Sequence, residues 1–387
     1  MENVIYEYQE INEENYKLIL HIRNTSALHK YFKEDWGRLK ARQYCGVLNH
    51  DAKDYYILPK ISNHQETNLN IFIYMLRYVY DIKLDNEDFA SSKNEEHHNF
   101  LEVFIQLFAK KLFKELQAGI YKEYMTEQDN LTTLRGKYLI NENLKYNFTN
   151  AKIYCEYDEF SMDNTLNQFF LYATKTLLPF AKDKNLLKLC ELVLDEVAYR
   201  YFDVKNLNVH FHRLNNRYKD SFEFAILLLS KSIPLFEKDK KSFAFLFDMN
   251  VLFEKFIARA IKETFDDVVI PSTYKEFGKL YLKPDIIVKS KSLIIDCKYK
   301  IKEDAKIASS EDRYQMYVYA NNFKDIHKTM LLYPKHHNQN EDLKRDLTLG
   351  NNDKKMELLM KSIDLDFYGK YEEFLEEIKN RLGKLNE

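Results

Sequence analysis

The sequence contains few of the residues that form tight turns and end helices. Only 8 of its 387 residues are glycine and 6 are proline, whereas 29 are tyrosine and 27 are phenylalanine. Most tight turns require glycine or proline, so their scarcity favours a helix-rich protein with few such turns. A hydrophobic content of 45% is ample for globular cores, and the length predicts two or three domains.

Cysteine, net charge and long apolar runs are also scarce. The four cysteines are far apart and form no C-x-x-C pair, so we interpret them as reduced thiols of a cytoplasmic protein. Residues 1–12 are acidic and polar, so we expect no signal peptide. The chain has no run of 18 apolar residues, so we expect no membrane span. The net charge of −2 excludes a polybasic coat for nucleic acid, so any DNA contact must use local patches.

A phosphate-binding P-loop is missing. That loop requires G-x-x-x-x-G-K-[ST]. The Gly-Lys pairs of this chain are all followed by tyrosine or leucine, and they begin at Gly136, Gly278, Gly369 and Gly383. We therefore expect no nucleotide-hydrolysing site here. If hydrolysis drives the activity, another subunit performs it.

Two apolar runs in the C-terminal third each carry an aspartate, in the pattern PD-x10-D-x-K. The aspartates are Asp285 and Asp296, and the lysine is Lys298. Mostly β-branched residues predict strands at 286–288 and 293–295, joined by a short polar link as a hairpin. Since side chains alternate along a strand, Asp296 and Lys298 are expected to share a face, and Asp285 to meet Asp296 across the hairpin.

This pattern suits a magnesium ion and the hydrolysis of a phosphodiester. The carboxylates of Asp285 and Asp296 and the backbone carbonyl of Cys297 are the hard oxygen ligands that Mg²⁺ prefers. Such a metal can activate water, and Lys298 would stabilise the charge that develops in the transition state. The alternative is a solvent-facing hairpin with a chance D-x-K string. Asp296 interrupts an apolar run, where an unpaired charge is costly, and this favours the metal site.

Lysine is locally in excess around this pattern. Between residues 279 and 306 there are eight lysines and four acidic residues. Such an excess suits contact with a phosphate backbone, and Lys283 and Lys300 are candidates for DNA binding.

Two predicted helices flank the hairpin. The upstream helix starts at Asp248 and carries Glu254 at the border of its apolar face, either as a third acidic ligand or as a solvated boundary residue. The downstream helix, residues 309–322, places Gln315 and Tyr319 four residues apart on one face. Both side chains could touch a bound DNA strand. Ordinary helix packing is the alternative, and it is the favoured one for Tyr319.

Histidine pairs elsewhere in the chain lack a carboxylate or cysteine set at ligand spacing, so we interpret them as surface or packing residues. They are His97 and His98, His210 and His212, and His336 and His337.

The remaining elements fall into three segments. Residues 1–99 mix short strands with one helix and end in a polar tract expected to be a loop or linker. Residues 100–240 are mainly helical, and residues 241–387 continue from the hairpin region to a final helix. The expected strands are 44–48, 55–61, 328–333 and 363–367, with strand character also at 139–160. The expected helices are 70–80, 165–181, 186–201, 221–233 and 370–382. The polar region 336–355 is expected to be mobile.

The C-terminal segment resembles the PD-(D/E)xK nuclease superfamily, and its Q-x3-Y element resembles that of the RecB-like branch. Residues 243–254, F-A-F-L-F-D-M-N-V-L-F-E, resemble a stretch of the McrC family, the nuclease subunit of McrBC-type restriction systems. Further stretches similar to that family run in family order from about Tyr56 to Tyr319. They are residues 56–61, 134–137 with Arg135, 155–159 with Asn164 and Asn167, and 213–218 with Arg213 and Arg217. For the three arginines, ion pairing within the helical region is slightly favoured over a functional role.

The resemblance implies a multidomain α+β or α/β fold. It implies an N-terminal mixed α/β domain at 1–99 that docks on a partner, a helical middle region at 100–240, and a restriction endonuclease-like α/β core at 241–387. Glu254 and Gln315 would join Asp285, Asp296 and Lys298 in catalysis. The implied partner is an McrB-like AAA+ GTPase hexamer that binds GTP, recognises double-stranded DNA and translocates it. The implied role is Mg²⁺-dependent cleavage of foreign DNA that often carries 5-methylcytosine.

Two other functions remain open at this point. The chain could be an activator or scaffold of the GTPase ring whose nuclease core has decayed, although intact Asp285, Asp296 and Lys298 argue against decay. It could also be a stand-alone RecB-like nuclease, against which the long N-terminal extension argues.

Overall fold

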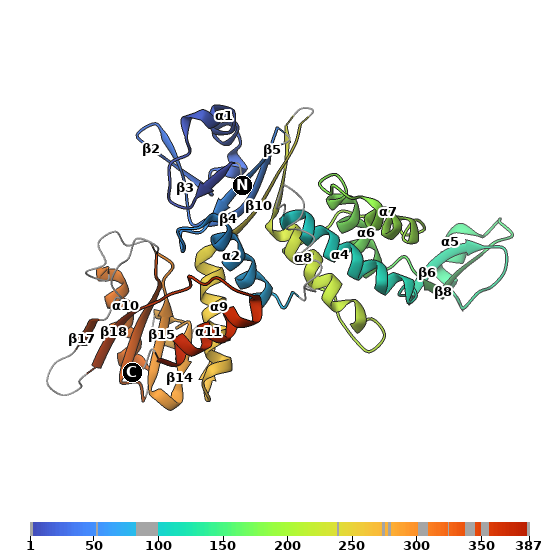
Figure 1. Ribbon diagram of the computed structural model, residues 1–387. Helices are drawn as coiled ribbons and strands as arrows, with labels where there is room; N and C mark the ends of the chain where they lie inside the picture. The colour runs from blue at the N-terminus through green and yellow to red at the C-terminus, as the bar shows by residue number, and fades with distance from the viewer. Residues whose placement is uncertain are drawn as a thin grey trace. The chain divides into compact units, whose positions relative to one another are not determined.

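The computed structural model describes residues 3–51, 53–82, 100–237, 240–272, 275–277, 280–300, 309–323, 325–336, 345–349 and 356–384. The chain divides into two compact units (Figure 1). The first unit is Met1–Asp85 with Leu246–Glu387, and the second unit is Asn86–Phe245. Segments from both ends of the sequence therefore build one unit. The separate roles expected for residues 1–99, 100–240 and 241–387 stay predictions.

The N-terminal part of the first unit combines a small sheet with helices. Strand β1 pairs in parallel with β5, and β4 pairs antiparallel with β5 on its other side, while β2 and β3 form a separate hairpin. The elements are β1 Val4–Tyr6, η1 Glu13–Asn15, α1 Tyr16–Asn24, η2 Ser26–Leu28, β2 Phe32–Asp35, β3 Arg38–Ala41, β4 Tyr44–His50, β5 Lys53–Leu58 and α2 Gln65–Val79.

Helix α2 begins at Gln65 instead of residue 70, and a buried asparagine explains the earlier start. The Asn68 Oδ1 atom accepts hydrogen bonds from the backbone N–H groups of Ile61, at 3.1 Å, and Ser62, at 2.7 Å. The polar first turn of the helix is therefore a brace for the preceding loop. The apolar periodicity of the sequence shows only the later turns.

The C-terminal part of the first unit contains a mixed six-stranded sheet in the order β11-β14-β15-β16-β18-β17. The central strands β15, β16 and β18 run parallel, and β14 and β17 pair antiparallel with them at the two sides. The elements are α9 Met249–Thr264, β11 Val268–Val269, β12 Lys275–Phe277, β13 Leu280–Leu282, β14 Ile286–Val288, η4 Lys289–Lys291, β15 Leu293–Cys297, α10 Ser310–Asn322, β16 Lys328–Pro334, β17 Arg345–Leu349, β18 Met356–Ile363 and α11 Tyr371–Gly383.

Helix α10 closes one face of this sheet. Its side chains Met316 and Tyr319 are buried in one core cluster with Ile294 of β15, Leu331 of β16 and Met360 of β18. Since side chains alternate along a strand, Asp296 lies on the same face as Ile294 and points toward α10. The packing of the sheet thus places a carboxylate beneath this helix.

Two expectations for the C-terminal region are wrong. A strand was expected at 363–367, but β18 begins at Met356 and ends at Ile363. Strand β17, Arg345–Leu349, lies inside the region expected to be polar and mobile. The apolar run of β18 is long enough for a strand, but its flanks contain no proline or glycine to fix its ends. Residues 337–344 and 350–355, and the polar tract 85–99, lie outside the described residues.

Contacts within the first unit join its N-terminal and C-terminal segments. The Tyr74 hydroxyl of α2 donates to the Gly369 carbonyl at 3.0 Å, and Arg259 of α9 forms an ion pair with Asp81 at 3.2 Å. The Tyr299 hydroxyl donates to the buried Glu7 carboxyl group at 2.6 Å. Each of these contacts joins residues more than 170 positions apart in sequence, so neither segment presents its native surface alone.

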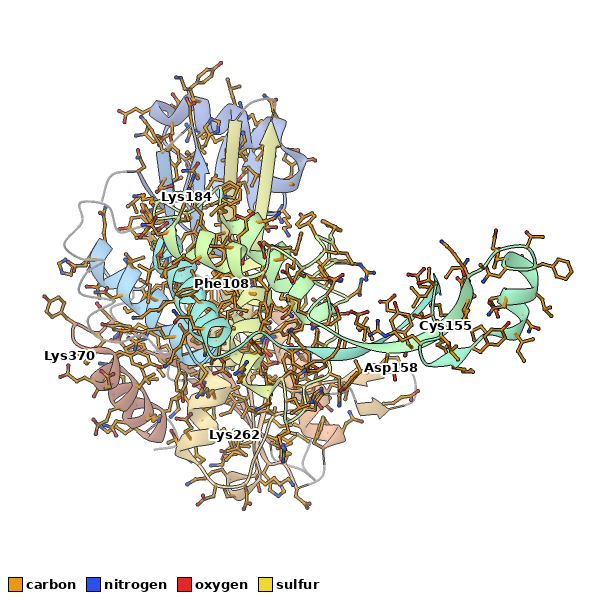
Figure 2. All side chains as sticks on the ribbon, turned by 90° about the vertical axis from the view of Figure 1, so that its right-hand side faces the viewer. Phe108, Cys155, Asp158, Lys184, Lys262 and Lys370 are labelled. Carbon is orange, nitrogen blue, oxygen red and sulfur yellow. The ribbon has the colours of Figure 1, made fainter. Side chains whose placement is uncertain are left out.

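The second unit contains a group of helices and a three-stranded sheet in the order β6-β8-β7. The elements are α4 Phe100–Gln117, β6 Glu123–Leu131, β7 Lys137–Tyr138, α5 Ile140–Tyr146, β8 Ile153–Ser161, α6 Thr165–Leu177, α7 Asn185–Val193, η3 Asn216–Tyr218, α8 Lys219–Lys231, β9 Ser232–Glu237 and β10 Lys240–Asp248, which continues into the first unit. Figure 2 shows Phe108 on α4 and Cys155 and Asp158 on β8.

The expectation of a mainly helical middle region is only partly right. Helices expected at 165–181, 186–201 and 221–233 are present, although α7 ends at Val193. Strand β6 was not expected because its sequence, E-Y-M-T-E-Q-D-N-L, has no apolar alternation and is exposed along most of its length. Helix α5 interrupts the strand character expected at 139–160.

Asparagine side chains hold α5 against this sheet. The buried Asn143 donates to the Leu139 and Tyr154 carbonyls at 2.7 and 2.6 Å and accepts from the Tyr154 N–H at 2.7 Å. Asn147 bonds both Asn143, at 2.9 Å, and Asn130 of β6, at 2.7 Å. Hydrogen bonds between asparagine side chains and the backbone therefore hold α5 in place, as apolar packing does for other helices. They leave large apolar side chains on the surface: Tyr124, Leu134, Tyr138, Ile140, Leu144, Tyr146, Phe148 and Phe160.

The arginines of the family-like stretches have structural contacts in two of three cases. Arg217 donates to the carbonyls of Ala118, at 3.1 Å, and Gly119, just after the end of α4. Arg135 forms an exposed ion pair with Glu159 at 3.5 Å. Arg213 is exposed.

Histidines and cysteines are also accounted for where they are described. His336 is buried, and His97, His98 and His337 lie outside the described residues. All four cysteines are free thiols, as expected. In the described ranges, every helix is too short or too polar to cross a membrane.

Substitution Glu7→Gln is expected to remove a pH dependence of stability. Burial raises the pKa of Glu7 from 4.5 to about 7, so the protonated form favours the folded state. This contribution is complete below pH 4.5 and is lost as the pH rises through 7. A shift of this size corresponds to about 3 kcal/mol. Urea unfolding at pH 5 and pH 8 should show the wild type losing stability relative to the variant at pH 8. An equal difference in free energy of unfolding between wild type and Glu7→Gln at both pH values would contradict the raised pKa of Glu7.

Candidate functional site

The β14–β15 hairpin brings the two aspartates together. Ile286 pairs with Ile295, so Asp285 and Asp296, the next residue on each strand, stand opposite each other. The Asp285 Oδ2 atom accepts a hydrogen bond of 2.8 Å from the Cys297 N–H. The η4 turn makes the short link that the sequence predicted between the strands. The hairpin geometry therefore agrees with the sequence prediction.

Lys298 forms a largely buried ion pair with Asp296. The Nζ atom lies 2.5 Å from Asp296 Oδ2, and the two side chains are 20% and 2% exposed. Burial alone would lower the pKa of Lys298, but the negative charges of Asp296 and Asp285 outweigh it and raise the pKa. The neighbouring carboxylates therefore favour the protonated form of Lys298.

Gln315 of α10 joins both members of this pair. Its Oε1 atom accepts from Lys298 Nζ at 3.0 Å, and its Nε2 atom donates to Asp296 Oδ1 at 3.2 Å. Nε2 also lies 2.8 Å from the hydroxyl of Tyr319, which donates to the Lys283 carbonyl at 3.0 Å. Tyr319 is buried in the core, so its bonds fix both Gln315 and the chain that enters Asp285.

Glu254 lies on α9 and is half-buried near the hairpin. Burial raises its pKa, the positive charge of Lys283 lowers it, and the negative charge of Asp296 raises it again. The structure therefore brings Glu254 into the same electrostatic cluster as Lys283, Asp296 and Lys298. A fully solvated boundary residue would not have these neighbours.

The cluster gathers negative charge in a poorly solvated place. Burial and the neighbouring charges of Asp296 and Glu254 raise the pKa of Asp285, and burial also raises the pKa of Asp296. A cation would relieve this repulsion, and carboxylate oxygens are the donors that Mg²⁺ takes. Among the described residues, no three His, Cys, Asp or Glu side chains form a ready-made metal cluster. The donor set is thus two facing carboxylates, with Glu254 nearby.

The two DNA-binding lysines predicted from the sequence differ in their surroundings. Lys283 is half-buried beside Glu254. Lys300 is engaged by the buried Asp312 of α10, whose two oxygens lie 2.9 and 3.0 Å from its Nζ. Burial raises the pKa of Asp312, but hydrogen bonds from Lys300 and Ser309 outweigh it and lower the pKa.

Two contacts of the site were missed by the sequence analysis. Ser309 caps α10 by accepting from the Asp312 N–H at 3.1 Å, and the spacing S-x-x-D could have indicated this cap. The bond from Tyr299 to Glu7 has no local pattern, because 292 residues separate the two.

Comparisons with known proteins agree with the family resemblance. A sequence model described as "McrBC 5-methylcytosine restriction system component" matches residues 39–334. The chain belongs to the McrBC family. No curated protein matches it.

Two solved structures of Thermococcus gammatolerans are similar to this family member. One is the refined half-complex from the tetradecameric assembly of McrB AAA+ hexamers with bound McrC, with 24% identity and a TM-score of 0.63, covering 98% of this chain and 99% of that chain. This likeness concerns the fold. The other is the McrBC complex solved by cryo-EM, with 27% identity and a TM-score of 0.49, covering 67% of this chain and 86% of that chain.

Substitution Tyr319→Phe is expected to lower the free energy of unfolding by about 1–2 kcal/mol, because the partly buried Lys283 carbonyl loses the hydrogen bond from the Tyr319 hydroxyl. Tyr314→Phe on the same helix is the matched control, since Tyr314 is 71% exposed. Denaturant unfolding of both variants measures the difference. Equal stability of the two would show that the buried hydroxyl contributes nothing.

Proposed function

We propose that this chain is the DNA-cleaving subunit of a GTP-dependent McrBC-type restriction complex. One observation carries the proposal: Asp285, Asp296, Lys298 and Gln315 meet in a single cluster at the ends of β14 and β15. The PD-x10-D-x-K pattern therefore corresponds to a spatial site. Membership of the McrBC family and a mixed α/β fold support the same function.

In this proposal, the carboxylates of Asp285 and Asp296, with the Cys297 carbonyl, hold Mg²⁺, and Glu254 is a further acidic ligand close by. When bound, the ion activates water and stabilises charge on the phosphate. The facing carboxylates fit such an ion because each raises the electrostatic cost of ionising the other.

The side chains around the carboxylates have separate tasks. Lys298 stays protonated and stabilises the negative charge that develops on the phosphodiester during attack. Gln315 holds the Lys298 ammonium group and the Asp296 carboxylate in fixed positions. Tyr319 holds Gln315 and the chain before Asp285, so the site is organised in advance. Lys283 and the exposed side of α10 would contact the DNA backbone.

The partner in this proposal is an McrB-like AAA+ hexamer that hydrolyses GTP. The similar T. gammatolerans assembly contains McrB AAA+ hexamers with bound McrC. The absence of a P-loop from this sequence supports the same division of labour. Double-stranded DNA, often methylated, is the proposed substrate of the complex.

The exposed apolar side chains of the second unit are our candidate for the partner contact. Phe148 is 85% exposed, and Ile140 and Leu144, one helical turn apart on α5, are 63% and 64% exposed. Exposed apolar side chains that gather on one surface are typical of protein interaction sites. Docking through residues 1–99, which the sequence suggested, is the competing assignment.

Substitutions Asp296→Asn and Lys298→Gln are each expected to reduce DNA cleavage at least about 100-fold. The first removes a carboxylate charge that would hold Mg²⁺, and the second removes the positive charge that would stabilise the phosphate in the transition state. GTPase stimulation should persist, since the exposed apolar surface is unchanged. Asp366→Asn, at an exposed aspartate of the same unit, is the control and should cleave normally. The assay uses the complex with its GTPase, Mg²⁺ and linear DNA. Cleavage by pure Asp296→Asn would refute the site.

The double substitution Leu144→Ser/Phe148→Ser is expected to weaken stimulation of the partner GTPase at least about tenfold, because two apolar contacts are lost. Tyr368→Ser, at a residue 90% exposed in the first unit, is the control. The chain alone should give no GTP turnover above background. Unchanged stimulation by the double variant would favour docking through the N-terminal residues.

A further inference from the structure

Glu7 lies just after strand β1, and its carboxyl group is fully buried beside the turn that carries Lys298. Its Oε1 atom accepts two hydrogen bonds, from the Tyr299 hydroxyl at 2.6 Å and from the Lys60 N–H at 3.0 Å. Its Oε2 atom lies 4.0 Å from the thiol of Cys45. The residue that follows the N-terminal strand thus contacts Tyr299, which is next to the candidate catalytic Lys298.

The ring of Tyr299 is buried on the side of α9. Its centroid lies 5.7 Å from that of Phe253, which precedes Glu254, and 6.1 Å from that of His336. The Lys298 N–H bonds the Leu332 carbonyl at 2.9 Å, so the strand pairing continues through residue 298. Alternation therefore points Lys298 and Tyr299 to opposite sides, and the position of one constrains the other.

A second path from the N-terminal segment ends at the same turn. The ring of His336 lies within hydrogen-bond distance of the Lys60 carbonyl, at 3.1 Å, and of the Lys300 carbonyl, at 3.3 Å. The Lys300 N–H bonds the Lys298 carbonyl at 3.1 Å. Lys60 therefore touches Glu7 through its N–H and His336 through its carbonyl, and residues 298–300 are held from both ends.

We infer that Glu7 is a positioning residue for the nuclease site, acting through the Tyr299 hydroxyl to fix the backbone of residues 297–300 and with it Lys298. The inference rests on the proposed function for the role of Lys298. It adds that the N-terminal segment is part of the catalytic apparatus, because the last link in the chain of contacts is made by Glu7, the residue after β1.

A carboxyl group suits this task because one of its oxygens accepts both donors. Removal of the acceptor leaves the Tyr299 hydroxyl and the Lys60 N–H buried without it, which is more costly than the bond is worth in isolation. Glutamine has the same shape and keeps a carbonyl oxygen at Oε1. The inference therefore predicts that glutamine replaces Glu7 and that alanine does not.

The test compares Glu7→Ala, Glu7→Gln, Tyr299→Phe and the double variant Glu7→Ala/Tyr299→Phe in the full complex with its GTPase. Glu7→Ala and Tyr299→Phe are each expected to lower kcat for DNA cleavage about tenfold with KM unchanged. The double variant should lose no more than either single one, because both break the same link. Glu7→Gln should stay within about twofold of the wild type. Tyr74→Phe is the control, since it removes another buried hydroxyl bond that joins the two segments.

A second measurement needs no cleavage. Hydrogen exchange of the metal-free chain should be faster in the peptide spanning residues 293–300 in Glu7→Ala and Tyr299→Phe, and unchanged there in Glu7→Gln and Tyr74→Phe. If residues 293–300 exchange slowly in the wild-type protein but that protein cuts no DNA, the proposed function is refuted and the contact between Glu7 and Tyr299 still stands. Additive losses of kcat, a Glu7→Gln variant as impaired as Glu7→Ala, or unchanged exchange in Tyr299→Phe would each overturn the inference.

Discussion

The buried ion pair between Lys298 and Asp296 is the interaction on which the polar centre of the first unit depends. Removing water from two charges costs several kcal/mol, and only close, well-oriented partners compensate for it. Here Gln315 bonds both charges, and the Cys297 N–H satisfies Asp285 next to them. The same side chains bind one another at the centre of the sheet and, in the proposed function, supply its chemistry. Stability and activity are therefore coupled at this point.

Helix α10 is the element that makes this arrangement possible. One of its faces carries Met316 and Tyr319 into the core, while Gln315 reaches the ion pair and Asp312 holds Lys300. The helix is fixed at its start by the Ser309 cap. Its position is thus determined by apolar packing and by charge together, and a small shift of the helix would disturb both.

The local parts of the site followed from the sequence. The strands of the hairpin, the shared face of Asp296 and Lys298, and the helix with Gln315 and Tyr319 all depend on periodicities of two or of about 3.6 residues. Such periods are visible in any short window of sequence. Strands β15 and β16 were correctly expected because apolar runs form them.

The remaining features depend on distant or polar contacts. The bond of Glu7 with Tyr299 crosses 292 residues, so no local pattern encodes it. Strand β6 is held by pairing with β8 and by asparagine bonds, and its side chains carry no alternation. The ion pair of Lys300 with Asp312 joins residues twelve positions apart, and no pattern in the sequence indicated it. Contact of Lys300 with DNA stays a prediction.

The separation between Glu7 and Tyr299 also has a consequence for biosynthesis. A ribosome adds about 5–20 residues per second, so on the order of 15–60 s pass between the synthesis of the two residues. During this time Glu7 has no Tyr299 to bind, and the segment that carries Lys298 does not exist. The nascent chain therefore cannot complete this contact until residue 299 has been made. Under the proposed function, a cell that makes this protein is spared a partly synthesised nuclease acting on its own chromosome.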